Sequence, residues 1–235
     1  MLYFLFKGGL FMKRTKLDDR ILPTYTKGEE IFNMVSHIVG GVAGIATIVL
    51  CSVFAAIRHN PYGVVSGVIF GVSMLFLYTM SSLYHGLKPN SKSKKVFQIL
   101  DHCAIFVLIA GSYTPFALCT LRQYSTALGW TIFGVIWAFA ALGITLNSID
   151  LKKYKVFSMF CYLAMGWCII VRGDVLPKLL GTAGFALLLS GGLVYTLGAV
   201  LYGIGKKKKY VHSIFHLCVF IGNVLHVLCV LLYVI

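Results

Sequence analysis

The segment KKKKYVHSIFHLCVFIGNVLHVLCVLLYVI, residues 206–235, decides the fold class of this chain. After the four lysines, the 24 residues from His212 to Ile235 contain no Asp, Glu, Lys or Arg. A helix needs about 20 predominantly apolar residues to cross a bilayer, so this segment predicts a membrane-spanning helix preceded by a basic loop. His212 and His216 are four residues apart, which places two metal-competent imidazoles on one face of that helix.

The composition extends this prediction to the whole chain. Of its 235 residues, 59% are hydrophobic and 12% are charged, and the mean hydropathy is +0.87. A soluble domain carries about 25% charged residues. The sequence therefore predicts an all-α, polytopic protein of the cell membrane that forms one helix bundle. Seven cysteines are scattered through apolar stretches without a CxxC pair, which indicates packing residues rather than disulfides or a thiolate metal site.

Charged and loop-forming residues divide the chain into seven candidate spans. Polar turns that contain proline, Arg58–Pro61 and Lys88–Ser91, are two of the breaks. The expected spans are 31–57, 62–87, 98–121, 123–147, 156–172, 179–203 and 211–235. Residues 1–30 are expected to form a cytoplasmic tail, and residues 31–235 a seven-transmembrane helix bundle. Pro115 is expected to kink the third span.

The distribution of basic residues predicts the orientation of this bundle. Lys and Arg number 17 on one side of the seven expected spans and 4 on the other. The positive-inside rule then puts the N-terminus in the cytoplasm and the C-terminus outside. The same clustering accounts for the formal net charge of +14 without a nucleic-acid partner. Translation from Met12 instead of Met1 would shorten only the cytoplasmic tail.

This orientation brings metal-competent and proton-active side chains to the cytoplasmic edge of the membrane. The second span ends with Ser81 and His85, the third begins with Asp101, and the seventh begins with His212 and His216. An ionisable group in a span is costly to bury and therefore predicts a functional site. Three imidazoles suit a catalytic zinc ion, which takes three protein ligands and keeps a fourth position for water. We expect Asp101 to take the proton of that water and Ser81 to bond the water, Asp101 or a substrate carbonyl.

Other polar residues in the spans have a weaker connection to this site. The alternative for Asp101 itself is an interfacial ion pair with Lys94 or Lys95. A supporting contact or a place in a cavity lining is expected for five further residues: Asn33, His37, His102, Asn223 and His226. The last two lie deep in the seventh span, where hydrogen bonding between helices is the favoured interpretation.

In combination and in this order, the polar motifs resemble those of a known family. The matching pieces are Glu29 and Glu30 with Asn33 and His37, then SSLYH at 81–85, LDH at 100–102, AGSYTPF at 110–116 and HSIFH at 212–216. From about Glu29 to its end, the chain resembles the hemolysin III branch of the progestin and adipoQ receptor family. That family is similar to a wider superfamily of membrane hydrolases that includes alkaline ceramidases.

The resemblance implies a function as well as a fold. It implies a seven-helix bundle with a cytoplasmic N-terminus and a zinc ion held by His85, His212 and His216, with Asp101 holding the zinc-bound water. Family members are linked to hemolytic activity and to lipid homeostasis. The expected function is therefore zinc-dependent hydrolysis of a lipid amide or ester, with membrane lipids as partners. The alternative is a non-enzymatic membrane regulator or cytolysin with structural zinc, and a pore ranks last. No hormone ligand is expected, because the sequence lacks the long N-terminal domain of the adiponectin receptors.

Overall fold

The structure is a computed structural model that describes residues 14–204 and 208–235. The alternative start at Met12 therefore lies outside the described residues. Within them the chain is helical, and six helices are long and apolar enough to cross a membrane, as the sequence predicts for an all-α membrane protein. The elements are α2 (Lys27–Ile57), α3 (Pro61–Gly86), α4 (Lys92–Pro115), the π-helix η1 (Phe116–Leu121), α5 (Arg122–Tyr124), α6 (Thr126–Trp167), the 3-10 helix η2 (Cys168–Arg172), α7 (Leu176–Ile204) and α8 (Val211–Tyr233).

Side-chain caps explain why two of the helices begin earlier than expected. Thr26 and Glu29 form a capping box, in which each side chain accepts a hydrogen bond from the backbone N–H of the other. This box starts α2 at Lys27 rather than at residue 31. Ser91 accepts a bond from the backbone of Lys94 and starts α4 at Lys92 rather than at residue 98. The charged residues Glu29 and Glu30 of α2 and Lys94 of α4 therefore lie within the helices.

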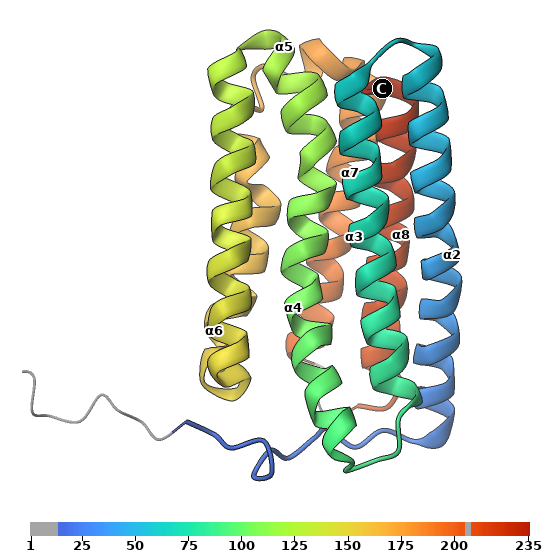
Figure 1. The fold of residues 1–235 in the computed structure, drawn as a ribbon, viewed down its shortest axis with the longest axis vertical. Coiled ribbons are helices and arrows are strands. Elements are labelled where there is room, and N and C mark those ends of the chain that lie inside the picture. The colour runs from blue at the N-terminus through green and yellow to red at the C-terminus, as the bar shows by residue number, and fades with distance from the viewer. Residues whose placement is uncertain (1–13, 205–207) are drawn as a thin grey trace, which may run out of the picture.

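Helix α6 consists of two arms that meet at Asp150. The backbone there is not helical, with φ −157° and ψ 93°, and Figure 1 shows the chain reversing its direction at this point. The Asp150 carboxylate caps the second arm by accepting bonds from the backbone nitrogens of Lys152 (3.0 Å) and Lys153 (3.1 Å). The sequence predicts a polar loop between the spans 123–147 and 156–172. In the structure the two spans are arms of one element, because the Asp150 carboxylate starts the second arm directly after the first.

The type of helix changes at Pro115, where the sequence predicts a kink. Helix α4 ends at this residue and continues as the π-helix η1, whose wider turn leaves room for the proline ring. Both segments lie in the centre of the bundle, and the span from Lys92 to Tyr124 is the most buried of the six. Because α4 is central, its polar residues can contact the helices packed around it, among them α3 and α6.

Small residues let α2 and α3 approach closely, as expected for helices in lipid. A Cβ atom at Gly44 would lie 2.9 Å from the backbone nitrogen of Leu75, and one at Gly71 would lie 2.7 Å from that of Ile48. Any larger residue at either position would push the two backbones apart. All seven cysteines are free, which confirms that they are not a disulfide framework.

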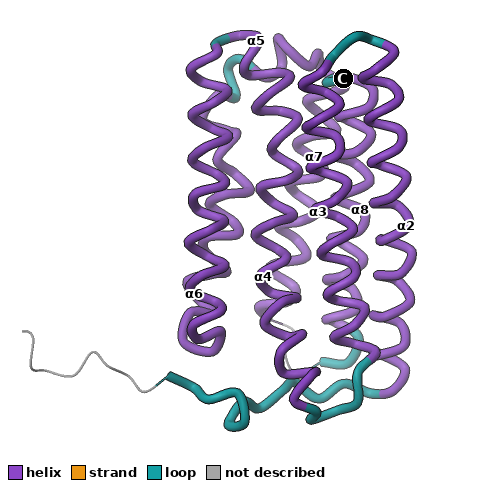
Figure 2. The backbone as a smooth tube through the Cα atoms, viewed as in Figure 1, coloured by secondary structure: helices purple, strands orange, loops and turns teal. Residues whose placement is uncertain are grey.

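Residues 14–26, here called the N-terminal strap, cross one end of the bundle from α6 to α2 (Figures 1 and 2). The backbone nitrogen of Thr15 donates to Asp150 at 2.8 Å, and Arg20 donates to Gln98 on α4 at 2.7 Å. The C-terminus lies at the opposite end of the bundle (Figure 1). The strap therefore marks one end of the molecule, which we call the strap end, and covers it from α6 to α2.

Candidate metal centre

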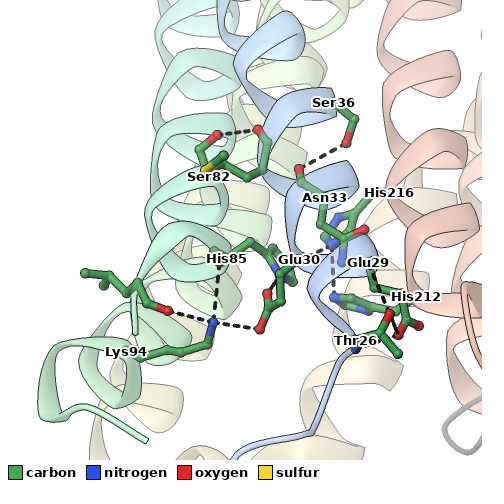
Figure 3. Close-up of polar contacts among 12 residues, drawn as sticks. Thr26, Glu29, Glu30, Asn33, Ser36, Ser82, His85, Lys94, His212 and His216 are labelled. Carbon is green, nitrogen blue, oxygen red and sulfur yellow. Dashed lines mark hydrogen bonds and ion pairs between the residues drawn. The ribbon is translucent and has the colours of Figure 1, made fainter. Parts of the chain in front are cut away.

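Three histidines from α3 and α8 converge at the strap end (Figure 3). His85 lies in the last turn of α3, and His212 and His216 lie in the first two turns of α8. The Nε2 atom of His216 is 3.2 Å from Nε2 of His85 and 2.9 Å from Nε2 of His212. The three ligand atoms all lie within 4.8 Å of one another. The structure thus brings the three predicted metal ligands into one group.

The donor set of this three-histidine group fits a small divalent cation. Two nitrogens bound to one tetrahedral zinc ion at about 2.0–2.1 Å lie about 3.3 Å apart. The Nε2 atoms of His85 and His216 are separated by 3.2 Å, which is close to that value. Imidazole nitrogens that face one another need a cation or a proton between them, because each neutral nitrogen offers a lone pair. The group is therefore chemically suited to hold a metal ion.

A buried ion pair fixes the orientation of the His85 ring. Nδ1 of His85 donates to Glu30 Oε2 at 2.6 Å, and the Lys94 ammonium lies 2.7 Å from Oε1 of the same carboxylate (Figure 3). The Lys94 side chain is only 2% exposed and also donates to the backbone carbonyl of Leu87 at 3.2 Å. A proton held on Nδ1 leaves the Nε2 lone pair free for a metal. Glu30 and Lys94 together therefore select the tautomer of His85 that can bind a metal.

Asp101 lies on α4 beside the same group. Its carboxyl is close enough to His85 for an electrostatic interaction and lies beside Ser81, whose hydroxyl is buried without a hydrogen bond of good geometry. The alternative ion pair with Lys94 or Lys95 is wrong, because Lys94 bonds Glu30 and Lys95 donates to a strap carbonyl. Asp101 is thus a buried carboxyl without a basic side chain paired to it in the described part of the chain.

Asn33 and His37, predicted as supporting residues, lie on the face of α2 that meets α8. The His37 ring packs edge-on against His216, with centroids 4.1 Å apart, and against Tyr78 at 5.1 Å. The side-chain nitrogen and oxygen atoms of both residues are buried and have no hydrogen-bond partner among the described residues. Buried polar atoms normally have partners, so these atoms are available to water or to a bound molecule.

The strap covers the three-histidine group at the strap end of the bundle. The sequence predicts that this end faces the cytoplasm. The ring of Tyr25 stacks on His212, with centroids 4.9 Å apart and an interplanar angle of 15°. Burial raises the pKa of the Tyr25 phenol well above its usual value, so the hydroxyl stays protonated. Leu22, three residues earlier, is also buried and anchors the strap. Tyr25 therefore shields the group from bulk water.

A cavity of about 140 Å³ extends from the three-histidine group into the bundle, between α4, the second arm of α6, α7 and α8. Its walls are mostly apolar and include Ile105, Leu108, Met159, Leu163 and Val219. Its polar lining includes six residues named by the sequence analysis: His37, Asp101, His102, His212, His216 and His226. The candidate ligands thus stand at one end of a space that suits an apolar chain.

Asn223 and His226 lie deeper on α8 and serve a different purpose. Asn223 donates to the hydroxyl of Tyr78 and accepts from the hydroxyl of Tyr195, both at 2.7 Å. Nε2 of His226 donates to the backbone carbonyl of Leu188 on α7 at 3.1 Å. These bonds connect α8 to α3 and α7, as the interpretation of interhelical hydrogen bonding predicts. Neither residue joins the three-histidine group.

The sequence analysis named Glu30 and Lys94 but not the contact between them, and it did not name Tyr25. Glu30 stands seven residues before His37, and Lys94 stands seven before Asp101, which is two helical turns in each case. This spacing places Glu30 and Lys94 on the same helix faces as His37 and Asp101, and it indicates that they lie near the three-histidine group. Tyr25 gave no comparable signal, because it precedes the first span and its position depends on the path of the strap.

Comparison with known proteins places this geometry in a family. The family model described as haemolysin-III related matches residues 25–227. Hemolysin-3 of Bacillus cereus is 40% identical over 206 residues, which cover 88% of this chain and 92% of that protein. The Hemolysin-3 homolog of Bacillus subtilis (strain 168) is 40% identical over 209 residues, covering 89% and 96%. The human monocyte to macrophage differentiation factor is 29% identical over 163 residues, covering 67% and 66%.

The match includes every element that contributes to the three-histidine group and its cavity, because it begins at Tyr25 and ends after His226. The predicted resemblance to the hemolysin III branch of the progestin and adipoQ receptor family is confirmed. With its six apolar helices, the chain is a multi-pass protein of the cell membrane and belongs to the haemolysin-III-related family.

Proposed function

We propose that this protein is a zinc-dependent hydrolase that cleaves an amide or ester bond of a membrane lipid. The observation that carries the proposal is the cavity, which is mostly apolar and has His212, His216 and Asp101 at its strap end. A purely structural metal site is closed by its protein ligands, whereas a catalytic one keeps an open position. A metal bound by these histidines would face the cavity, where a lipid carbonyl can reach it while the acyl chain lies along the apolar walls.

His85, His212 and His216 would hold the ion through their Nε2 atoms. Bound zinc lowers the pKa of a coordinated water to about 7 and polarises a carbonyl group. Asp101 accepts the proton from the attacking water as its oxygen bonds to the carbonyl carbon, and then passes the proton to the leaving amine or alcohol as the C–N or C–O bond breaks. The buried hydroxyl of Ser81 donates a hydrogen bond to the carbonyl oxygen as its charge develops.

We also infer that both arms of α6 cross the membrane, which gives seven crossings with the strap end in the cytoplasm. The support is the reversal of the chain at Asp150 and the 17-to-4 distribution of basic residues. Single cysteines introduced at Lys153 and Asp174, at the two ends of the second arm, test this topology in a background that lacks reactive cysteines. Lys153→Cys should react with a membrane-impermeant reagent only from the inside, and Asp174→Cys only from the outside. Labelling of both from one side would exclude a crossing by this arm.

The hydrolase proposal is tested with the purified, metal-loaded protein and ceramide-like and phospholipid substrates. Mass spectrometry should detect a fatty acid released by the wild type. The Asp101→Asn variant should retain its metal and lose at least about 100-fold of the rate, because general base catalysis contributes about 10²–10⁴-fold. Asp174→Asn, a matched change of an exposed carboxylate in the turn before α7, should keep the wild-type rate. Release that is unaffected by Asp101→Asn and by chelation, or no release from any lipid class, would exclude this mechanism.

A second function is favoured by the names of the Bacillus relatives, which are called hemolysins. In that case the protein would disturb target membranes without hydrolysis, and the metal would be structural. An erythrocyte lysis assay separates the two proposals. A cytolysin with structural metal should lose activity with His85→Ala, which removes a ligand, and keep it with Asp101→Asn.

A further inference from the structure

Three lysines lie in the first turns of the second arm of α6, and only Lys155 faces the cavity. It lines the cavity together with Met159, Tyr162 and Gly166, which follow at the spacing of one helix face. Lys152 and Lys153 belong to the same basic stretch but are exposed and do not line the cavity. Of the three lysines at positions 152, 153 and 155, the chain therefore directs only Lys155 toward a mostly apolar space.

This cation has no anionic partner in the described part of the chain. No carboxylate lies within ion-pair distance of Lys155, and its ammonium sits over the ring of Tyr202, 5.2 Å from the centroid. It is close enough to interact electrostatically with His102 and with the metal-ligand candidate His212. A half-buried ammonium without a counter-ion is unfavourable, so its position indicates that another molecule supplies the negative charge.

A second cation lies in the strap, outside the cavity lining but close to His102, which lines the cavity. Arg20 of the strap also interacts electrostatically with His102, and its Nε is buried without a hydrogen-bond partner. Arg20 also donates to the neutral amide of Gln98 and is attracted by the Asp150 carboxylate. The strap end of the cavity is thus approached by two basic groups that retain unused donors, one from the strap and one from α6.

The nearby carboxylates leave the Lys155 ammonium without a counter-ion. Glu30 is bonded to Lys94 and His85, and Asp150, which also accepts bonds from three backbone nitrogens, attracts Arg20 rather than Lys155. Asp101 is the carboxylate among the cavity-lining residues. A divalent metal on three neutral imidazoles more than balances that single negative charge, so the strap end of the cavity keeps an excess of positive charge.

From this arrangement we propose that the cavity selects lipids with an anionic, phosphate-bearing headgroup, and that Lys155 is the residue that recognises it, with Arg20 assisting. The inference rests on the proposed function, since it names the class of lipid that the hydrolase would accept. The acyl chain lies along the apolar walls, and the phosphate oxygens receive charge-assisted hydrogen bonds from the ammonium. Such a headgroup places the adjacent ester or amide linkage near His212 and Asp101.

Binding of ether-linked lipids tests the inference separately from catalysis, because a hydrolase of esters or amides cannot cleave them. The full-length, zinc-loaded protein in non-ionic detergent is titrated with dioctyl ether phosphatidic acid and with the matching dioctyl ether glycerol, and bound lipid is counted by native mass spectrometry. The wild type should prefer the phosphate lipid by about tenfold or more. Lys155→Met should abolish most of this preference, and Lys155→Arg should retain it.

Lys152→Met is the matched control, since it removes an exposed charge from the same turn. It should leave the preference unchanged. An equal loss of the preference for the phosphate lipid in Lys152→Met and Lys155→Met would show general surface attraction and overturn the inference. An undiminished preference in Lys155→Met would also overturn it. Displacement of the lipid by an equal concentration of inorganic phosphate would identify a site for the free anion instead. If no ester or amide is hydrolysed but the preference for the phosphate lipid is observed, the proposed function is wrong and this inference stands. If hydrolysis is observed without that preference, this inference is wrong and the proposed function stands.

Discussion

Helix α8 buries polar side chains in two places, and the two differ in how their hydrogen-bonding atoms are satisfied. At the strap end, the Nε2 atoms of His212 and His216 face each other and His85. Deeper in the bundle, both polar atoms of the Asn223 amide bond tyrosine hydroxyls on neighbouring helices, and His226 bonds a backbone carbonyl. Three imidazole nitrogens face one another at the first place, whereas the Asn223 amide and Nε2 of His226 have complementary partners at the second, where Nδ1 of His226 alone has none among the described residues.

This difference separates a binding site from a packing contact. A polar group inside a membrane is costly unless it is paired, so pairs formed within the protein stabilise the bundle. The three-histidine group has no such solution, because three neutral imidazoles at this distance compete for the same few protons. We therefore expect the stability of the three-histidine group to depend on a bound metal, and that of the deeper cluster not to. The following experiments test this division, in order of decreasing effect.

Metal content should show the largest contrast. His216→Ala should reduce bound metal from about one ion per chain to near zero, because His216 lies within 3.2 Å of both other ligands. His226→Ala removes a histidine of the same helix and should leave metal content unchanged. Elemental mass spectrometry of protein purified without chelators gives the values. Equal metal content in the two variants would contradict the assignment of the site.

Metal removal should affect stability through the same group. Zinc at 1,000 times its dissociation constant stabilises a folded state by about 4 kcal/mol, or roughly 10 °C in melting temperature for a chain of this size. We expect chelation to lower the melting temperature of the wild type and added zinc to restore it. The melting temperature of His216→Ala should not respond to either treatment. A zinc response of that variant equal to the wild type's would place the stabilising metal elsewhere.

The Glu30–Lys94 pair should have an intermediate effect on metal affinity. Lys94→Met leaves the Glu30 carboxylate without its cation and weakens control of the His85 tautomer, so zinc affinity should fall about 10–100-fold. Lys94→Arg keeps the charge and should recover most of the affinity. Lys95→Met, which removes a bond to a strap carbonyl, is the control and should bind zinc normally. Competition with a zinc-sensitive dye measures the constants, and equal affinity in Lys94→Met and the wild type would remove this role.

The deeper cluster should show the smallest effect, and on stability alone. Asn223→Ala leaves the hydroxyls of Tyr78 and Tyr195 without their partner, which should lower stability by about 1–2 kcal/mol. Metal content should stay at the wild-type level. Denaturation in detergent, followed together with elemental analysis, checks both statements. A loss of metal in Asn223→Ala would mean that the two clusters of α8 are coupled rather than independent.

Much of the fold follows from local properties of the sequence. Hydrophobic length and the positions of polar breaks predict the spans, because a bilayer accepts only helices with about 20 apolar residues. The four-residue spacing of His212 and His216 is likewise local, and the alternation of direction between successive spans is enough to bring His85 to the same edge. The all-α membrane class and the three-histidine group were therefore predictable from the sequence.

Other features depend on how each helix is rotated about its axis, which only packing decides. Rotation of α4 turns Lys94 toward Glu30 instead of Asp101, and rotation of the second α6 arm directs Lys155, but neither of its neighbours, into the cavity. The strap places Tyr25 on His212 through bonds to residues far away in sequence. The sequence by itself determined which side chains stand at the strap end, and the tertiary structure decided which of them meet, because contacts across helices depend on rotations and distances that no local pattern encodes.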